Sequence, residues 1–229
     1  MLRLAAFDMD GTLVDAVSSW AAVHEHFGDR NEEGLRLFNA GKIDDHEFLR
    51  RDIAVWWRHA PDLTIDDLEA ILAKVHLMPG ARELFDALRA ERVTTAIISG
   101  GIDVLAHRVA KELGIDVALA NGFRVNSVGR LTGDGIIRVP IRDKETVLQK
   151  LQDDLGIGPG ETASVGNSEI DVGMFRRSSV GVAFLPEDGE VRRGATDVVE
   201  EKNLARLIPI LLPGRRGGTS QRPSGGPLP

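Results

Sequence analysis

The chain begins with a short apolar run that is followed at once by two carboxylates. Residues 2–7 have the composition of a buried strand, and Asp8 and Asp10 follow it, with Gly11 and Thr12 next. Ligands of an open α/β sheet bind just beyond the carboxyl ends of its strands. Two carboxylates there suit a hard cation such as Mg²⁺, and one can act as a nucleophile toward phosphorus. Asp and Gly are also ordinary turn residues, so this motif alone does not distinguish a functional site from a turn.

Strand-like and helical patterns alternate through most of the remaining sequence. β-branched residues fill 93–98, and shorter apolar runs cover 163–166 and 180–184, with a helical pattern at 146–155. Strands that alternate with helices indicate a parallel sheet flanked by helices. We therefore predict an α/β fold with a doubly wound, Rossmann-like parallel sheet. Glycines between short apolar runs at 121–139 predict a hairpin or flap.

Residues 15–77 depart from this alternation, because they show helical periodicity and no convincing strand. They predict a small helical cap domain inserted after the first strand, and the α/β core domain then comprises residues 1–14 and 78–212. Residues 213–229 are rich in Pro, Gly, Ser and Arg and lack aromatic residues. Such a segment buries too little apolar surface to fold, so we predict a disordered tail.

Composition narrows the classes of partner. The 229 residues are 42% hydrophobic, and the formal net charge of −7 disfavours nucleic acid and anionic membranes. The chain has no cysteine, which excludes disulfides and thiolate metal sites and fits a reducing compartment. No apolar stretch approaches the roughly 20 residues that span a bilayer, and the N-terminus lacks a signal-peptide layout. We expect a cytoplasmic protein; its oligomeric state stays open.

Three further polar patterns occur in order along the chain. Ser99 and Gly100 follow a strand, where a hydroxyl and backbone N–H groups can hold phosphate oxygens, although a capping turn has the same composition. Lys144 begins a predicted helix, where the helix dipole slightly disfavours a cation, so we suspect a functional role. Asn167 and Asp171 lie in a polar loop after another strand, which suits metal ligands or a helix cap.

These four motifs have the order of the haloacid dehalogenase superfamily, which the chain resembles from Leu4 to Leu212. The likeness is greatest to its phosphoserine phosphatase-like members, and it is carried by Ile98-Ser99-Gly100-Gly101, Leu131-Thr132-Gly133-Asp134 and Val165-Gly166-Asn167. The resemblance implies a Mg²⁺-dependent phosphatase that hydrolyses a small phosphorylated metabolite, a phosphate monoester, through an aspartyl-phosphate. The alternatives are a phosphotransferase and a non-catalytic phosphate-binding protein with a degenerate metal site.

The resemblance also implies a role for each motif residue. Asp8 would be the nucleophile, and Asp10 would protonate the leaving oxygen and later activate water. The implied phosphate-binding residues are Ser99, Gly100 and Lys144, and the implied metal ligands are Asp8, Asp10, Asn167 and Asp171. Mg²⁺ and Lys144 would neutralise the repulsion between the Asp8 carboxylate and a phosphate dianion. Each pair of like unit charges at 4 Å costs about 4 kcal/mol at an effective dielectric constant near 20.

Three positions depart from the family pattern. Asn167 stands where the family carries a metal-binding aspartate, so we expect weaker metal binding. Val17 stands where phosphoserine phosphatases carry a glutamate, and Asp52 falls where a substrate-binding arginine is expected. The sequence therefore does not predict phosphoserine as the substrate. Candidates for lining a pocket for another ester are Arg50, Arg51, Trp56 and Trp57, with packing in the cap core as the alternative for both tryptophans.

Overall fold

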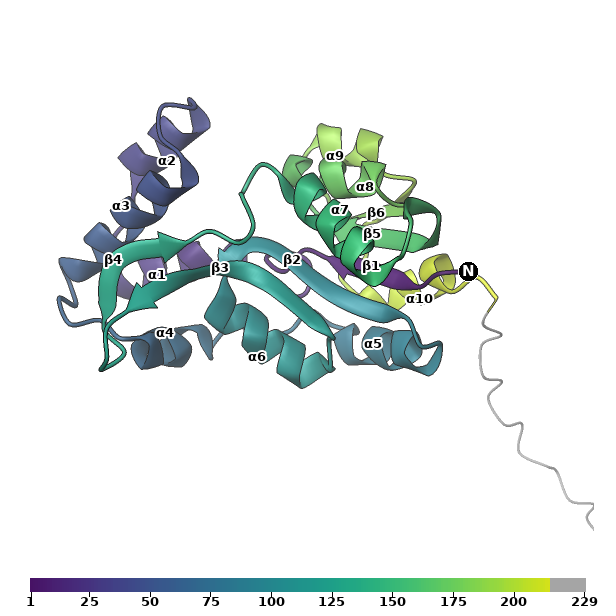
Figure 1. Cartoon of the computed structure of the whole chain (residues 1–229), viewed down its shortest axis with the longest axis horizontal. Coiled ribbons are helices and arrows are strands. Elements are labelled where there is room, and N and C mark those ends of the chain that lie inside the picture. Colours follow the sequence, from purple (N-terminus) through teal and green to yellow (C-terminus); the bar gives the residue numbers. More distant parts are fainter. Residues whose placement is uncertain (215–229) are drawn as a thin grey trace, which may run out of the picture.

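A computed structural model describes residues 1–214 of the chain as a seven-stranded sheet with helices on both faces (Figure 1). The strand order is β4-β3-β2-β1-β5-β6-β7, and every neighbouring pair is parallel except β3–β4. The strands are β1 (Leu4–Phe7), β2 (Thr94–Ile102), β3 (Val117–Val125), β4 (Leu131–Ile136), β5 (Thr162–Gly166), β6 (Val180–Phe184) and β7 (Asp197–Val199). This arrangement confirms the predicted α/β, doubly wound sheet.

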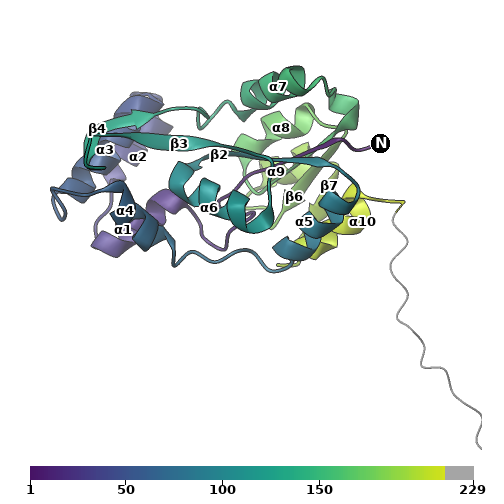
Figure 2. The same ribbon diagram turned by 60° about the horizontal axis from the view of Figure 1, so that its bottom comes forward.

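The helices divide between the two faces and one end of the sheet (Figures 1 and 2). Helices α4, α5 and α6 lie along one face, and α7 and α8 lie on the other. The helices are α1 (Ser19–Phe27), α2 (Glu32–Asn39), α3 (Asp45–Trp57), α4 (Ile65–Leu72), α5 (Ala81–Ala90), α6 (Asp103–Leu113), α7 (Lys144–Leu155), α8 (Val172–Arg176), α9 (Gly189–Gly194) and α10 (Ile208–Leu211). Short 3₁₀ turns cover Pro159–Glu161, Glu169–Asp171 and Leu204–Leu207.

Strand β1 lies at the centre of the sheet and is buried on both faces. Its alternate side chains enter different apolar clusters, because successive residues of a strand point to opposite faces. Ala5 and Phe7 pack on the α5 side, where the rings of Phe7 and Phe85 lie 5.0 Å apart, and Leu4 and Ala6 pack on the α7 side. The strand is therefore held firmly, and it ends at the residue before Asp8.

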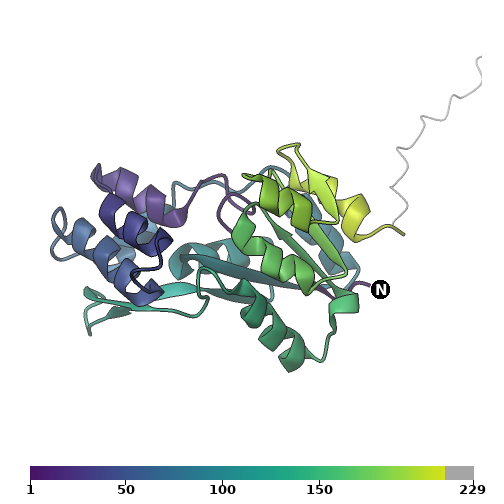
Figure 3. The same cartoon turned by 90° about the horizontal axis from the view of Figure 1, so that it is seen from above.

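Helices α1, α2 and α3 lie together beyond one end of the sheet, next to the β3–β4 hairpin (Figure 3). The antiparallel pairing of β3 with β4 confirms the hairpin predicted at 121–139. The amide of Leu131 donates to the carbonyl of Leu63 at 3.0 Å, and the amide of Ile65 donates to that of Gly129 at 3.0 Å. The hairpin thus joins the helical segment by backbone hydrogen bonds.

Two glycines let the hairpin approach α3 closely. A Cβ atom at Gly133 would lie 2.7 Å from the Trp57 ring, and one at Gly135 would lie 2.5 Å from Leu49. The division into a cap at 15–77 and a core at 1–14 and 78–212 stays a prediction. The predicted tail lies outside the described residues, apart from its first two positions. Among residues 1–214, no helix has the length and apolar character needed to cross a bilayer.

Candidate active site

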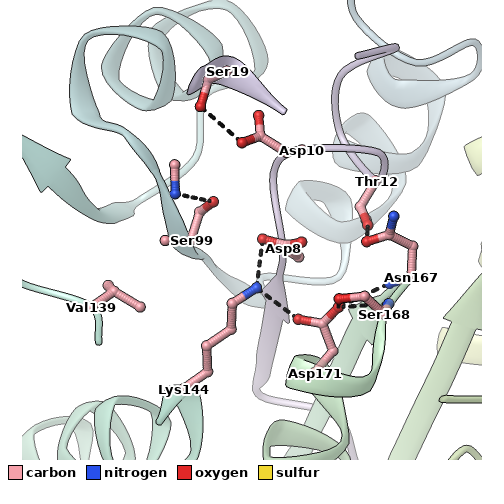
Figure 4. Close-up of polar contacts among 12 residues, drawn as sticks. Asp8, Asp10, Thr12, Ser19, Ser99, Val139, Lys144, Asn167, Ser168 and Asp171 are labelled. Carbon is pink, nitrogen blue, oxygen red and sulfur yellow. Dashed lines mark hydrogen bonds and ion pairs between the residues drawn. The ribbon is translucent and has the colours of Figure 1, made fainter. Parts of the chain in front are cut away.

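Three buried charges meet where strands β1 and β5 end (Figure 4). The Lys144 ammonium lies 2.7 Å from Asp8 Oδ1 and 2.7 Å from Asp171 Oδ1. The side chain of Lys144 is 1% exposed, and those of Asp8 and Asp171 are 7% and 0% exposed. A buried charge is tolerated only when it is paired. The contacts therefore explain why a lysine occupies the first turn of α7 despite the helix dipole.

The environment of this cluster sets its protonation. Burial alone would lower the pKa of Lys144, but attraction to Asp171 and Asp8 outweighs it and raises that pKa, so Lys144 stays charged. Burial raises the pKa of Asp8 to about 7, opposed by Lys144 and reinforced by Asp171. Two carboxylates thus share one ammonium, and additional positive charge here would favour ionised Asp8.

Asp171 also shapes the loop that follows β5. Its Oδ2 atom accepts hydrogen bonds from the amides of Asn167 at 3.0 Å and Ser168 at 3.1 Å, while Oδ1 faces Lys144. A Cβ atom at Gly166 would lie 2.3 Å from the Asp171 carboxyl carbon. Both oxygens of Asp171 therefore have protein partners. Through these contacts Asp171 positions Lys144 and the loop that contains Asn167 and Ser168.

Asn167 has an acidic partner that the sequence reading missed. Its side-chain amide nitrogen donates to Glu187 Oε1 at 2.9 Å, and the Thr12 hydroxyl donates to its Oδ1 at 3.5 Å. Burial raises the pKa of Glu187, reinforced by Asp171 and Asp188. Glu187 thus places a carboxylate beside Asn167, which has an uncharged amide where a carboxylate was expected. Its sequence signal was an acidic pair shortly after strand β6.

Asp10 is connected to helix α1 through Ser19. The Ser19 hydroxyl donates to Asp10 Oδ2 at 2.8 Å and accepts from the Ile102 amide at 3.0 Å. The other oxygen, Oδ1, is buried and has no hydrogen-bond partner within the described residues. Burial raises the pKa of Asp10 to about 6, although hydrogen bonds from Ser19 oppose the rise. A carboxyl with this pKa can carry a proton and exchange it near neutral pH.

The remaining predicted motif lies at β2, beside Asp8. Ser99 is 1% exposed, and its hydroxyl accepts from the Gly101 amide at 3.1 Å. The indole of Trp20 donates to the Gly100 carbonyl at 3.1 Å, which ties this turn to α1. A Cβ atom at Gly101 would lie 2.6 Å from Asp10 Oδ2, so the close approach requires glycine.

All four motifs border one cavity of about 780 Å³. It contacts residues of each motif, namely Asp8, Asp10, Ser99, Gly100, Lys144 and Asn167, and it continues between helices α1, α2 and α3. Asp171 lies behind Lys144 and does not border the cavity. The structure therefore brings together the motifs that the sequence placed at separate strand ends.

The structure does not place the four predicted pocket residues at this cavity. Arg50, Arg51, Trp56 and Trp57 are not among the residues that border the cavity. Arg50 and Arg51 both pair with Glu47 of the same helix, and Arg50 also lies 3.5 Å from Asp134 Oδ1 on β4. Trp56 is fully buried in the apolar core, and Trp57 packs against the hairpin, as the alternative interpretation had it. Helical periodicity indicated that these residues share α3 but not which side faces the cavity.

The cap end of the cavity is instead built around Asp52. Its Oδ1 atom lies 2.9 Å from His24 Nε2 and accepts from the Asn31 side chain at 2.9 Å. The Trp56 indole donates to His24 Nδ1 at 3.2 Å, so Nδ1 is an acceptor and the neutral ring carries its proton on Nε2. Asp52 is 2% exposed, and its Oδ2 accepts no hydrogen bond within the described residues. This network joins α1, α2 and α3.

The donor set near Asp8 fits a hard cation. It consists of oxygens only, from Asp8 and Asn167 with the Glu187 carboxylate behind Asn167, and its acids outnumber Lys144. The only hydrogen bond that the Asn167 amide oxygen accepts from the described residues is the long one from Thr12. No three acidic or histidine side chains in residues 1–214 converge as a ligand group, so a bound cation would also need amide or backbone oxygens.

The comparisons with known proteins agree with this geometry. The family model of haloacid dehalogenase-like hydrolases matches residues 5–176, and the chain belongs to this family. Phosphoserine phosphatase of Archaeoglobus fulgidus is 30% identical, with 91% of this chain and 60% of that protein covered. Phosphoserine phosphatase of Methanocaldococcus jannaschii is 27% identical, with 90% and 96% covered.

Solved structures extend the likeness to three dimensions. A structure of a phospho-aspartyl intermediate analogue of phosphoserine phosphatase is 26% identical, with a TM-score of 0.76 over 91% of this chain and 98% of that one. A substrate-bound phosphoserine phosphatase complex is 25% identical, also with a TM-score of 0.76. Within its family, the chain is therefore similar to phosphoserine phosphatases in both sequence and fold.

Proposed function

We propose that the chain is a phosphatase that hydrolyses a small phosphate monoester through an aspartyl-phosphate on Asp8. The observation that carries the proposal is the common cavity of Asp8, Lys144 and Asp10. Lys144 lies 2.7 Å from Asp8, and one Asp10 oxygen has no hydrogen-bond partner among residues 1–214. The relatives named phosphoserine phosphatase and the likeness to a phospho-aspartyl intermediate analogue support it.

In the first half-reaction, an Asp8 oxygen attacks phosphorus, and an oxygen–phosphorus bond forms as the ester bond breaks. The leaving alkoxide takes the proton of Asp10, whose raised pKa keeps that proton available. Lys144 and the Ser99 hydroxyl offset the charge of the phosphoryl group, because transfer depends mostly on positioning and charge neutralisation. Ser19 orients Asp10 toward the leaving group.

In the second half-reaction, a water molecule attacks phosphorus and gives its proton to ionised Asp10. The bond between Asp8 and phosphorus breaks, which restores the Asp8 carboxylate and releases inorganic phosphate. The net change is hydrolysis of the ester, and both aspartates return to their starting states. Asp10 thus serves as acid and then as base, as microscopic reversibility requires of one group facing both oxygens.

Mg²⁺ is the cation that this donor set would hold, through Asp8, the Asp10 backbone carbonyl and Asn167, with Asp171 and Glu187 supporting from behind. When bound, it would supply positive charge that reduces the repulsion between the Asp8 carboxylate and a phosphate dianion. Asn167 provides an oxygen without charge, so we expect the nearby Glu187 to contribute the missing negative charge.

The test is the release of phosphate from an aryl phosphate, with and without Mg²⁺, by the full chain and by Asp8→Asn. We expect turnover that needs the cation and falls at least about 10⁴-fold in Asp8→Asn. Adding a primary alcohol distinguishes transfer to water from transfer to another hydroxyl. Undiminished turnover in Asp8→Asn would rule out the covalent route, and no turnover with any ester would favour a phosphate-binding protein.

A further inference from the structure

We propose that Asp52 recognises a protonated amine on the alcohol part of the substrate, so that the preferred ester is a phosphorylated amino alcohol without a carboxylate. This inference rests on the proposed function, because it assumes that the phosphate lies beside Asp8. Asp8 and Asp52 border the two ends of the same cavity. A zwitterionic substrate would place its anionic end beside Lys144 and its cationic end beside Asp52.

The first observation is the unequal use of the two Asp52 oxygens. The side chains of His24 and Asn31 both contact Oδ1, whereas Oδ2 is buried and accepts nothing from the described residues. A buried carboxylate oxygen without a donor is unfavourable. An ammonium group in the cavity would supply donors and charge together. The site thus has an acceptor that no part of the described structure satisfies.

The second observation is that the negative charge of Asp52 is not cancelled nearby. His24 contacts Asp52 through Nε2, and because its Nδ1 accepts from the Trp56 indole, this contact is a hydrogen bond from an Nε2–H group. The Asp52 carboxylate therefore keeps its attraction for a cation. A pair formed away from bulk water is stronger than the same pair at the surface.

The third observation is the composition of the cavity wall at this end. Glu25, Glu32 and Arg30 border it, so acidic groups outnumber basic ones once Asp52 is included. The aromatic rings there belong to Trp20, Phe38 and Phe48. These rings form an apolar wall, in which Phe38 stacks on Phe48 and Trp20 stacks on Trp56. The excess of acids attracts a cation and repels a carboxylate, which favours an amine over an acidic group.

The experiment compares four esters of similar size: phosphoethanolamine, propyl phosphate, phosphoglycolate and glycerol 3-phosphate. Propyl phosphate has nearly the shape of phosphoethanolamine but carries a methyl group in place of the ammonium group. We expect kcat/KM for phosphoethanolamine to exceed that for propyl phosphate by about 10- to 100-fold, the usual range for a hydrogen bond to a charged group. Phosphoglycolate should be the poorest of the four.

Asp52→Asn is the decisive variant, because it keeps an oxygen for His24 and Asn31 and removes only the charge. We expect the ratio of phosphoethanolamine to propyl phosphate to fall to near unity while propyl phosphate turnover persists. Glu47→Gln is the matched control: it makes the same change on α3 outside the cavity lining, and it should leave the ratio unchanged. The melting temperature of each variant reports whether the helices still pack.

Binding supplies a measurement that does not depend on turnover. In Asp8→Asn, calorimetry should show phosphoethanolamine binding more tightly than propyl phosphate, and adding Asp52→Asn should remove that difference. Equal binding of the two, preference for phosphoglycolate or glycerol 3-phosphate, or an equal loss for every ester in Asp52→Asn would overturn the inference. If no ester or aryl phosphate is hydrolysed, the proposed function is wrong. The binding comparison then still tests whether Asp52 recognises the amine.

Discussion

The two ends of the cavity are built in different ways. At the phosphate end, the functional groups lie in the last part of a strand, just after a strand or on the first turn of a helix, and the sheet fixes the spacing between them. At the cap end, His24 lies on α1, Asp52 lies on α3 and Asn31 caps α2, and side-chain hydrogen bonds join the three. The comparison teaches that the chemistry depends on backbone pairing, whereas recognition of the alcohol depends on helix packing.

The largest expected effect lies at the phosphate end. Asp10→Asn should lower turnover of alkyl phosphates about 10²- to 10⁴-fold, because the leaving alkoxide loses its proton donor. Asp10 acts protonated and has a pKa raised by burial to about 6. When a saturating cation keeps Asp8 ionised, kcat/KM of the wild type should therefore fall tenfold per pH unit above that value. A pH profile checks this.

That profile also provides the control. Asp10→Asn should lack the fall above pH 6, since its amide does not titrate. For an aryl phosphate, whose leaving group needs no proton, kcat/KM should fall much less in this variant, because kcat/KM reports formation of the aspartyl-phosphate and not its hydrolysis. If alkyl and aryl esters were affected equally, Asp10 would not be the acid, and the contrast between the two ends would lose its chemical basis.

An effect of intermediate size on Mg²⁺ binding is expected at Glu187, which lies outside the four motifs but contacts Asn167. Glu187→Gln should weaken Mg²⁺ binding about tenfold, because it removes one charge near the cation at surface-like dielectric. Asn167→Asp places that charge on the ligand itself and should tighten binding in the Glu187→Gln background. Calorimetric titration with Mg²⁺ measures both variants; unchanged affinity in Glu187→Gln would show that Glu187 only orients the amide.

The smallest effect is expected at two arginines of α3 that do not border the cavity. Arg50→Ala and Arg51→Ala should leave kcat/KM for every ester within about twofold, because their ion pairs with Glu47 are partly exposed and worth at most about 1 kcal/mol. Steady-state kinetics with phosphoethanolamine and propyl phosphate checks this. A selective loss for one ester would place these arginines in recognition and contradict the assignment of Asp52.

The same contrast explains what the sequence could predict. A strand followed by Asp8 and Asp10, and a lysine that begins a helix, are local patterns with fixed positions at a sheet edge, so the motifs could be expected to meet. Asp52 was noticeable only as a departure from the family pattern. Its contacts with His24 and Asn31 depend on how three helices pack, and no local spacing encodes that packing.

Glu187 and Trp20 were missed for a related reason. Glu187 follows a strand but belongs to no motif, and its value depends on an asparagine twenty residues away. Trp20 shares the helical spacing of the cap segment and was not singled out from the sequence, yet its indole donates to the Gly100 carbonyl and its ring borders the cavity. Periodicity indicates that a residue is sheltered and does not indicate whether a cavity lies beside it.

The β3–β4 hairpin bears on how new specificities could be made by recombination. Leu49 and Trp57 of α3 pack on glycines of that hairpin, and Leu63 and Ile65 are bonded to it through the backbone. Residues 15–77 transferred alone into a relative would therefore lack the β3–β4 hairpin against which they pack. A working chimera would have to carry residues 117–136 as well, so the exchangeable unit is discontinuous in the gene although contiguous in space.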